Sequence, residues 1–145
     1  MHASYTNTFE GVSMITSTVG DLKYGAAFAL PGIGIFINPR DINNIDLLRH
    51  EFGHILQARK WGYLFFYRTI VAASVKSAHK SNKHANFNHQ HTWTEWSANL
   101  LAYHYFNKPA DWNMNRYPIK PPGNTPSITL LPRQIKMLLG DVGLC

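Results

Sequence analysis

Residues 44–62 read NIDLLRHEFGHILQARKWG, and this stretch decides the fold of the chain. Its apolar residues recur at the spacing of one helix face: Ile45, Leu48, Phe52, Ile55 and Leu56. Gly62 follows as a C-terminal stop. We therefore expect an amphipathic helix from Asn44 to about Lys60, with its apolar side buried against the rest of the domain.

The same helix carries a His-Glu-x-x-His motif. His50 and His54 are four residues apart, which places both imidazoles on one helix face within reach of a single ion. Glu51 lies about 100° further round, where it can touch a bound water but is poorly placed to coordinate a metal. The pattern predicts two Zn²⁺ ligands and a general base. The competing interpretation is a surface helix with two solvated histidines.

Gly53 lies inside this motif. A glycine within a helix costs about 1 kcal/mol relative to alanine. A bare backbone at this position would let another helix or a strand approach the metal closely. The alternative is that the glycine has no such role and is simply tolerated, although it weakens the helix.

Two histidines do not complete a catalytic zinc site, which normally has three protein ligands and one open position. The single cysteine, Cys145, is the last residue, so the ligands must offer nitrogen or oxygen. Glu95 is the only glutamate after Glu51 and is the first candidate. His89 and His91 compete with it, and Asp111 ranks behind them.

Two neighbours of Glu95 favour opposite interpretations. Residues 92–95 read TWTE, a capping box in which the glutamate would simply cap the start of a helix. Asn99, one helical turn later, can instead accept a hydrogen bond from a ligand histidine and fix the tautomer of its ring. Both interpretations stay open on the residues alone.

The sequence HEFGH, followed some forty residues later by WTEWSAN, resembles the gluzincin branch of the zincin metallopeptidases. In that branch a glutamate on a following helix is the third ligand, and four residues later an aspartate braces a ligand histidine. Glu95 and Asn99 match those places, with asparagine instead of aspartate, and Thr94 replaces the usual asparagine. More closely, LRHEFGHILQ and HTWTEWSANLLAYHYF are similar to small zincin domains at the C-termini of bacterial Rhs-type and other polymorphic secreted toxins.

The resemblance covers residues from about 33 to 106. It implies a zincin-like fold, with a short β-sheet beside an active-site helix and a following ligand-bearing helix. A strand such as GIGIFIN, residues 32–38, would then bind substrate by edge pairing. The likeness and the lack of a signal-peptide pattern at the start also predict a toxin or effector, secreted or delivered as the C-terminal part of a larger bacterial protein. Such a chain would have a protein substrate and an inhibitor or immunity protein as partners.

The rest of the chain predicts a single α+β domain spanning residues 1–145. We expect a pair of strands and three principal helices, followed by an extended proline-rich tail from about residue 117. The expected elements are strands at 11–19 and 32–38, helices at 44–60, 63–77 and 92–107, a loop at 79–91 and a short helix at 132–139. The helix at 63–77 is expected to be the more buried of the first two.

Composition narrows the classes of partner. Hydrophobic residues make up 45% of the chain and the net charge is +6, which indicates a folded, basic domain. The densest group of cations is Lys76, Lys80 and Lys83, which we interpret as a solvated loop rather than a nucleic-acid footprint. The longest apolar run, residues 63–75, is interrupted by Arg68 and is too short to span a bilayer. No nucleic-acid partner and no transmembrane segment are expected.

These observations predict a zinc-dependent peptidase. His50, His54 and Glu95 hold Zn²⁺ and Glu51 is the general base. His91 is the candidate for stabilising the oxyanion, with His89, Tyr103, His104 and Tyr105 as rivals. Gln57 receives no catalytic role. The alternatives are a zinc-binding module that recognises a peptide without cutting it, and a basic nucleic-acid-binding domain.

Overall fold

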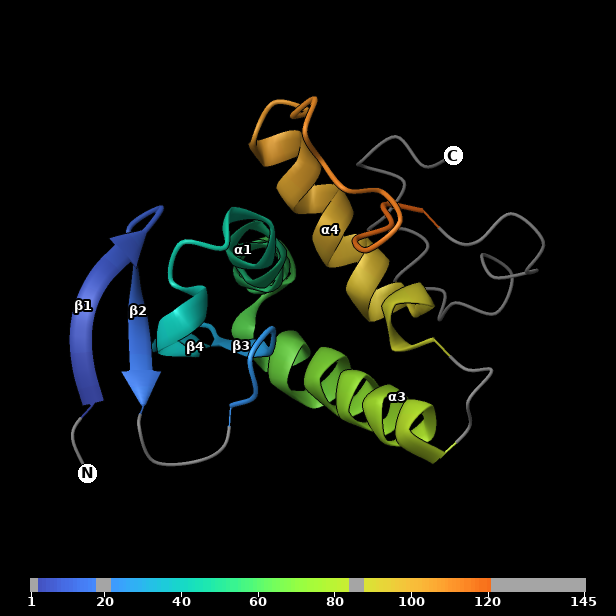
Figure 1. Ribbon diagram of the computed structural model, residues 1–145. Coiled ribbons are helices and arrows are strands. Elements are labelled where there is room, and N and C mark those ends of the chain that lie inside the picture. The colour runs from blue at the N-terminus through green and yellow to red at the C-terminus, as the bar shows by residue number, and fades with distance from the viewer. Residues whose placement is uncertain (1–2, 18–21, 84–87, 121–145) are drawn as a thin grey trace.

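A four-stranded sheet forms one side of the molecule (Figure 1). The computed structural model describes residues 3–17, 22–83 and 88–120, without the side chains of residues 3–6, 17, 81 and 91. The strands are β1 (Ala3–Phe9), β2 (Val12–Ser17), β3 (Ala27–Leu30) and β4 (Gly34–Ile37), in the order β1-β2-β4-β3. The β2–β4 pair is parallel, whereas β1–β2 and β3–β4 are antiparallel.

Both predicted strands form, as β2 and β4, and they pair with each other, but the sheet has two further strands that were not predicted. The β1 sequence, ASYTNTF, is largely polar, and the β3 sequence, AFAL, is only four residues long. Neither carries an apolar run long enough to stand out, so pairing with β2 and β4 decides their conformation.

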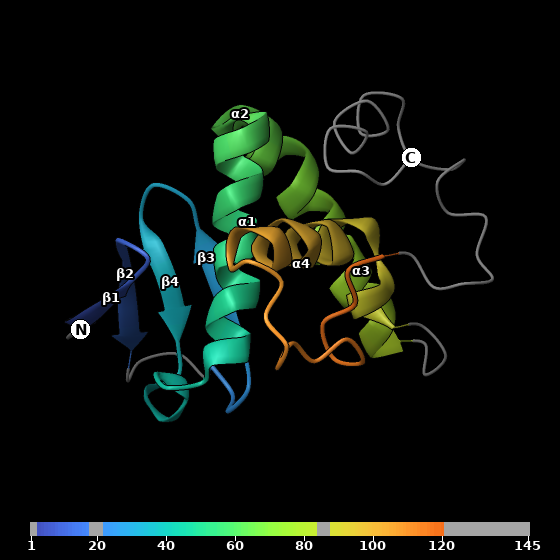
Figure 2. The same cartoon turned by 90° about the horizontal axis from the view of Figure 1, so that it is seen from above.

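The structure also corrects which strand is available for edge pairing. β4, the GIGIFIN segment, is hydrogen-bonded to β2 on one side and to β3 on the other. Its backbone groups are therefore used inside the sheet. Of the two edges of the sheet, β3 is the one that lies beside the central helix (Figure 2).

The central helix matches its prediction closely. The helical elements are η1 (Pro39–Asp41), α1 (Ile45–Trp61), α2 (Tyr63–Phe65), η2 (Phe66–Val71), α3 (Ala72–Lys83), η3 (His89–His91) and α4 (Trp93–Tyr105). The Asn44 side chain caps α1 by accepting a hydrogen bond from the Leu47 amide at 3.2 Å. Gly62 ends α1 with a positive φ of 95°, which glycine adopts without strain.

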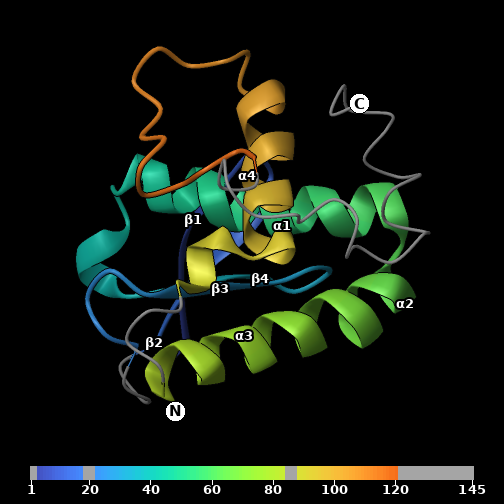
Figure 3. The same cartoon turned by 90° about the vertical axis from the view of Figure 1, so that its right-hand side faces the viewer.

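The second helical region is longer and more exposed than expected. α2, η2 and α3 form one continuous run from residue 63 to 83, in which η2 is a π-helical turn. Residues 79–83 are therefore helical, not part of a loop, and Lys76, Lys80 and Lys83 lie on this helix. Only one side of the run is buried, through Phe66, Ile70 and Ser77. The run folds back alongside α1 in the opposite direction (Figure 3).

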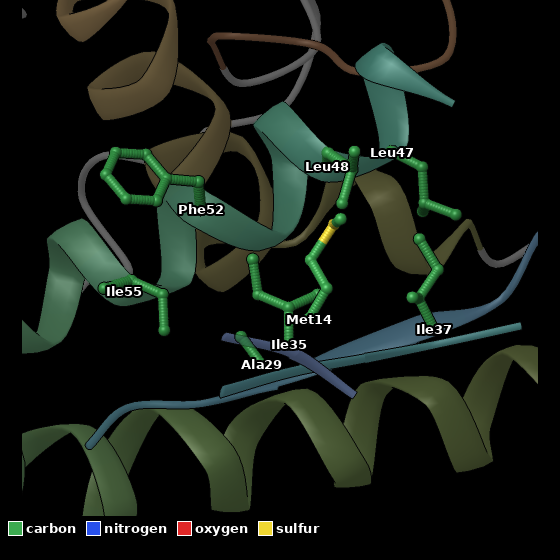
Figure 4. Close-up of a cluster of buried hydrophobic side chains, with 8 residues drawn as sticks. All are labelled: Met14, Ala29, Ile35, Ile37, Leu47, Leu48, Phe52 and Ile55. Atoms are coloured by element: carbon green, nitrogen blue, oxygen red, sulfur yellow. The ribbon is translucent and has the colours of Figure 1, made fainter. Parts of the chain in front are cut away.

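The main hydrophobic core joins the sheet to α1 (Figure 4). It contains Met14, Ala29, Ile35 and Ile37 from the sheet and Leu47, Leu48, Phe52 and Ile55 from the helix. Each fully buried large side chain contributes about 1.5–3 kcal/mol relative to exposure. This packing fixes the apolar side of α1 on the sheet, so the side with the histidines faces the other helices.

α4 crosses α1 at very short range (Figures 1 and 2). A Cβ atom placed on Gly53 would overlap the Ala98 carbonyl oxygen and would lie 2.6 Å from its carbon. The expectation that Gly53 permits close approach of another helix is therefore confirmed. The crossing buries Trp96, Ala98 and Asn99 of α4.

The chain beyond α4 returns over this crossing. Tyr117 is buried, and the Asn99 side-chain amide donates to the Pro118 carbonyl at 2.9 Å. The predicted tail beyond residue 120 and the predicted helix at 132–139 lie outside the described residues. A small sheet beside a helical layer confirms the α+β class. Within the described part of the chain, no helix is both long and apolar enough to cross a membrane.

Candidate metal centre

His50 and His54 of α1 and Glu95 of α4 meet at the helix crossing. Glu95 Oε2 lies 3.3 Å from His50 Nε2 and 3.4 Å from His54 Nε2. All three side chains are buried, and their ligand atoms lie within 4.8 Å of one another. The group could hold a metal ion. The structure thus brings together the three residues that the sequence predicts as ligands.

Two amide side chains fix the histidine tautomers. His50 donates its Nδ1–H to Asn99 Oδ1 at 2.6 Å, and His54 donates its Nδ1–H to Gln57 Oε1 at 2.8 Å. The orientation of each side-chain amide follows from the hydrogen bonds that its NH2 group donates. Asn99 Nδ2 donates to the Pro118 carbonyl, and Gln57 Nε2 donates to the Thr94 carbonyl at 2.8 Å and to Ser97 Oγ at 2.7 Å. Both Nε2 atoms therefore face Glu95, which is how ligand histidines are usually held.

Asn99 takes the bracing role that the sequence predicts for it. The sequence assigned Gln57 no catalytic role, and the structure places it in contact with a candidate ligand. It is fully buried and links His54 of α1 to the start of α4. Its position one turn after His54 was visible in the sequence, but its partners on α4 were not.

The capping-box interpretation of Glu95 is wrong. The Thr92 hydroxyl donates to the His89 carbonyl at 2.8 Å and makes no cap hydrogen bond to α4. The Glu95 carboxylate points into the protein, where its Oε1 accepts from Ser74 Oγ at 2.9 Å and from Thr94 Oγ1 at 3.2 Å. These two hydroxyls occupy one carboxylate oxygen and leave Oε2 to the histidines.

The other predicted ligands take different places. His89 Nε2 lies 3.5 Å from Glu95 Oε1, on the far side of the carboxylate, and His89 Nδ1 lies 2.8 Å from Ser77 Oγ. Asp111 is exposed and pairs with Arg49 at 3.2 Å. The side chain of His91 lies outside the described part of the structure, so its role stays a prediction.

Three rivals for the oxyanion role lie elsewhere. Tyr103 packs edge-on against Trp112, and His104 packs against Tyr103. The Tyr105 hydroxyl donates to Glu10. None of the three lines the cavity next to the histidines.

That cavity has a volume of about 700 Å³ and runs between β3 and the 66–75 segment. His50, Glu51 and His54 line it from α1. Tyr117 and Arg116 line it from the chain beyond α4, and no motif or spacing in the sequence pointed to either residue. The Tyr117 ring lies 5.2 Å from the His50 ring, and its hydroxyl accepts from Arg116 Nε at 3.2 Å.

The charges of the three clustered residues are strongly coupled. Burial alone would raise the pKa of Glu95, but the neighbouring His54 and His50 outweigh it and hold that pKa well below its ordinary value. Burial would lower the pKa of His54, but the Glu95 carboxylate outweighs it and raises this pKa to about 9. The pKa of His50 is raised as well, because Glu95 and Glu51 together outweigh its burial. The site therefore holds positive charge readily.

Glu51 lies beside this group but has a different environment. Its Oε1 is 3.9 Å from His50 Nε2, and the side chain lines the cavity. Burial raises the pKa of the Glu51 carboxyl, against the opposing effect of the two histidines and of a hydrogen bond from the Ala29 backbone. A carboxylate of raised pKa at a cavity wall has the properties of a general base.

Comparisons with protein-family models, with curated proteins and with solved structures found no match to this chain.

Proposed function

We propose that the protein is a zinc-dependent peptidase. The observation that carries the proposal is the separation of the facing ligand atoms. Atoms about 2.0–2.1 Å from a tetrahedral zinc ion lie about 3.3–3.4 Å from one another. Glu95 Oε2 lies 3.3 and 3.4 Å from the two Nε2 atoms. A charge-assisted N–H···O hydrogen bond would bring these atoms closer, to about 2.7–2.9 Å.

Zinc is the metal that this donor set favours. Two neutral imidazoles and one carboxylate, without a thiolate, match the three-ligand sites of catalytic zinc. Ser74 and Thr94 occupy Glu95 Oε1, which favours coordination through Oε2 alone. The cavity beside the three residues leaves room for a water molecule and a substrate.

The chemistry follows from the position of Glu51. Zinc held at this site would polarise a water molecule and the scissile carbonyl. Glu51 takes the proton from the attacking water and delivers it to the leaving amine nitrogen. The Tyr117 ring lies 5.2 Å from the His50 ring, and burial raises the pKa of the Tyr117 phenol, so it keeps its proton and can donate to the developing oxyanion. In this scheme Tyr117 competes with His91 for the oxyanion role.

A peptide substrate fits the edge of the sheet. β3 lines the cavity along its whole length, and β4 covers only one of its sides. The Ala29 amide hydrogen-bonds Glu51, so the free edge of β3 faces the reacting groups. An extended peptide paired with β3 would carry its scissile bond past Glu51.

The three glutamates of the chain provide the test. Glu51→Gln keeps the shape of the side chain but removes the base, so it should bind one zinc per chain and cut at least ~10²-fold more slowly. Glu95→Gln should lose zinc. Glu10→Gln, at an exposed position, is the matched control and should change neither property. Zinc is measured by elemental analysis, and cleavage is read by mass spectrometry on a mixed-peptide library.

Each outcome has a definite meaning. No zinc in the wild type, even after zinc is added, contradicts the metal centre. Equal cleavage by the wild type and Glu51→Gln contradicts the mechanism. Zinc and peptide binding without cleavage by any variant would identify a recognition module in place of a peptidase.

We also propose that the chain acts as a delivered toxin, supported by the resemblance of its two motifs to secreted-toxin zincin domains. Expression of the wild type inside cells should arrest growth, and Glu51→Gln should not. Equal growth with both variants would contradict the toxin proposal and leave the peptidase proposal to its own test.

A further inference from the structure

The charge of the chain is concentrated in one segment. Residues 52–94 contain six of the fourteen Lys and Arg residues and none of the eight Asp and Glu residues. The rest of the chain has eight cations and eight acids, so this segment carries the whole net charge of +6. Most of it forms the end of α1 and the helical run from residue 63 to 83.

The exposed side of this helical run is continuous. No two successive exposed residues along it are more than four positions apart: Tyr63, Leu64, Tyr67, Arg68, Ala72, Val75, Lys76, His79, Lys80, Asn82 and Lys83. The widest step, from Arg68 to Ala72, spans the π-helical turn at 66–71. The opposite side lines the metal-centre cavity through Phe66, Ile70 and Ser74, and the exposed Val75 also lines it.

Large apolar side chains gather at the start of this run. Tyr63, Leu64 and Tyr67 are 49%, 66% and 39% exposed, and Ile33 in the β3–β4 turn is 60% exposed. The turn and the helix are joined, because the Tyr67 hydroxyl donates to the Pro31 carbonyl at 2.8 Å. A Cβ on Gly32 would lie 3.6 Å from the Tyr63 ring. Tyr63 and Tyr67 therefore lie against the turn that carries Ile33, and Leu64 follows Tyr63 in the helix, so the four exposures are grouped at one end of the run.

We propose that this surface docks on an anionic lipid bilayer. The docking surface consists of an apolar part, Ile33, Tyr63, Leu64 and Tyr67, and a basic part, Arg68, Lys76 and Lys83. Tyrosines and aliphatic side chains at one end insert among lipid headgroups, while the cations along the helix contact the negative surface. Neither the helical run nor residues 31–33 contain a carboxylate that would oppose this contact.

A nucleic acid would contact only the basic part of this surface favourably. Phosphate backbones attract the cations, but the bases of a duplex stay paired and stacked on one another, so the four exposed side chains of the apolar part gain little from it. A bilayer uses both parts at once. Because the cavity lies on the other side of the same helices, docking would place the metal centre close to the membrane surface.

The test is co-sedimentation of the full chain with vesicles. We expect binding to phosphatidylcholine vesicles that contain about 30% phosphatidylserine, weaker binding in high salt, and little binding to pure phosphatidylcholine. Lys76→Gln with Lys83→Gln should weaken binding roughly 25-fold, at roughly fivefold per lysine. Leu64→Ser should weaken it roughly tenfold.

Matched controls separate charge from position. Lys23→Gln with Lys120→Gln removes the same charge from exposed positions outside the docking surface, and should weaken binding less than threefold. Glu51→Gln should bind vesicles like the wild type, so this test does not depend on peptidase activity. Circular dichroism confirms that each variant is folded.

Three results would overturn the proposal. The first is no sedimentation with anionic vesicles, and the second is equal weakening by the two lysine pairs. The third is binding to duplex DNA that is tighter than vesicle binding, depends on Lys76 and Lys83, and ignores Leu64. The last result would reassign the basic part to nucleic acid.

Discussion

At the scale of single residues, two buried amides orient the histidines of the candidate metal centre. The side-chain oxygen of Gln57 and of Asn99 accepts a hydrogen bond from a candidate ligand histidine. The amide nitrogen of each donates to a backbone carbonyl, and that of Gln57 also donates to a hydroxyl. This arrangement holds both imidazoles with Nε2 toward Glu95 before any metal arrives. Preorganisation of this kind lowers the ordering cost of binding.

Removing either amide should therefore weaken zinc binding. Gln57→Ala and Asn99→Ala are each expected to reduce zinc affinity about 10- to 100-fold, because the ring is no longer held in its ligand tautomer. Competition with a chromophoric chelator measures the affinity. Gln90→Ala is the control, since Gln90 lines the cavity and, among the described residues, no group donates a hydrogen bond to its side-chain oxygen. An unchanged affinity in the Gln57 and Asn99 variants would show that the amides only pack.

Zinc binding should release protons at neutral pH. The pKa of His54 in the metal-free protein is raised to about 9, so at pH 7 this ring carries a second proton that zinc must displace. Affinity should therefore rise with pH until about 9. Calorimetry at pH 7 in buffers of different ionisation enthalpy measures the released proton. Identical heats in all buffers would contradict this coupling.

The same shifts predict the pH range in which the metal-free fold is most stable. The raised pKa of His54 contributes stability that is complete below its ordinary value of 6.5 and is lost as pH rises through about 9. The depressed pKa of Glu95 contributes stability that is present above its ordinary value of 4.5 and is lost as pH falls below it. Urea unfolding of the chelator-treated protein should therefore give its highest midpoint between about pH 4.5 and 6.5. A maximum above pH 9 would contradict this assignment.

At the scale of elements, the crossing of α1 and α4 builds the centre. α1 provides the two histidines and Glu51, the proposed base, and α4 provides the carboxylate and one bracing amide. The sheet holds α1 from below through the core, and the 63–83 run contributes the Ser74 hydroxyl that fixes Glu95. The short distance between the two helices at this crossing depends on Gly53, which has no side chain.

Gly53→Ala tests that dependence. In an ordinary helix this change would stabilise by about 1 kcal/mol. Here the new methyl group would overlap the Ala98 carbonyl, so the helices must separate and the protein should lose about 1–3 kcal/mol or more. Zinc affinity should fall with it, because Glu95 moves away from the histidines. Urea unfolding and chelator competition measure both effects, and a more stable variant would contradict the close crossing.

At the scale of the whole molecule, the metal would tie together segments that are distant in the sequence. A ligand at 1,000 times its dissociation constant stabilises the folded state by about 4 kcal/mol. For a domain of this size that corresponds to roughly 10 °C in Tm. Removal of zinc with a chelator should lower Tm by about this amount, and re-addition should restore it, as scanning calorimetry can measure. Glu95→Gln should have a Tm that the chelator does not change.

The local pattern of the sequence was enough to predict α1 and to place His50, Glu51 and His54 close together on it. Their geometry depends only on helical periodicity and on caps within the same segment, Asn44 and Gly62. The α+β class followed in the same way. The resemblance of WTEWSAN to a ligand-bearing helix also selected Glu95 and Asn99, the two α4 residues that the structure places against the histidines.

Only the tertiary structure decided the rest, because the remaining contacts join residues far apart along the chain. β1 and β3 are too polar or too short to be recognised without their partners in the sheet. The TWTE sequence fits a cap and a ligand equally well, and the approach of α1 and of Ser74 turned Glu95 inward. Tyr117 and Arg116 reach the cavity because the chain after α4 folds back over it, which no periodicity records. The exposure of the 63–83 run was also not visible in the sequence. Its apolar residues suggested burial, yet one side of the run lies exposed, because the run contacts α1 and α4 through its other side only.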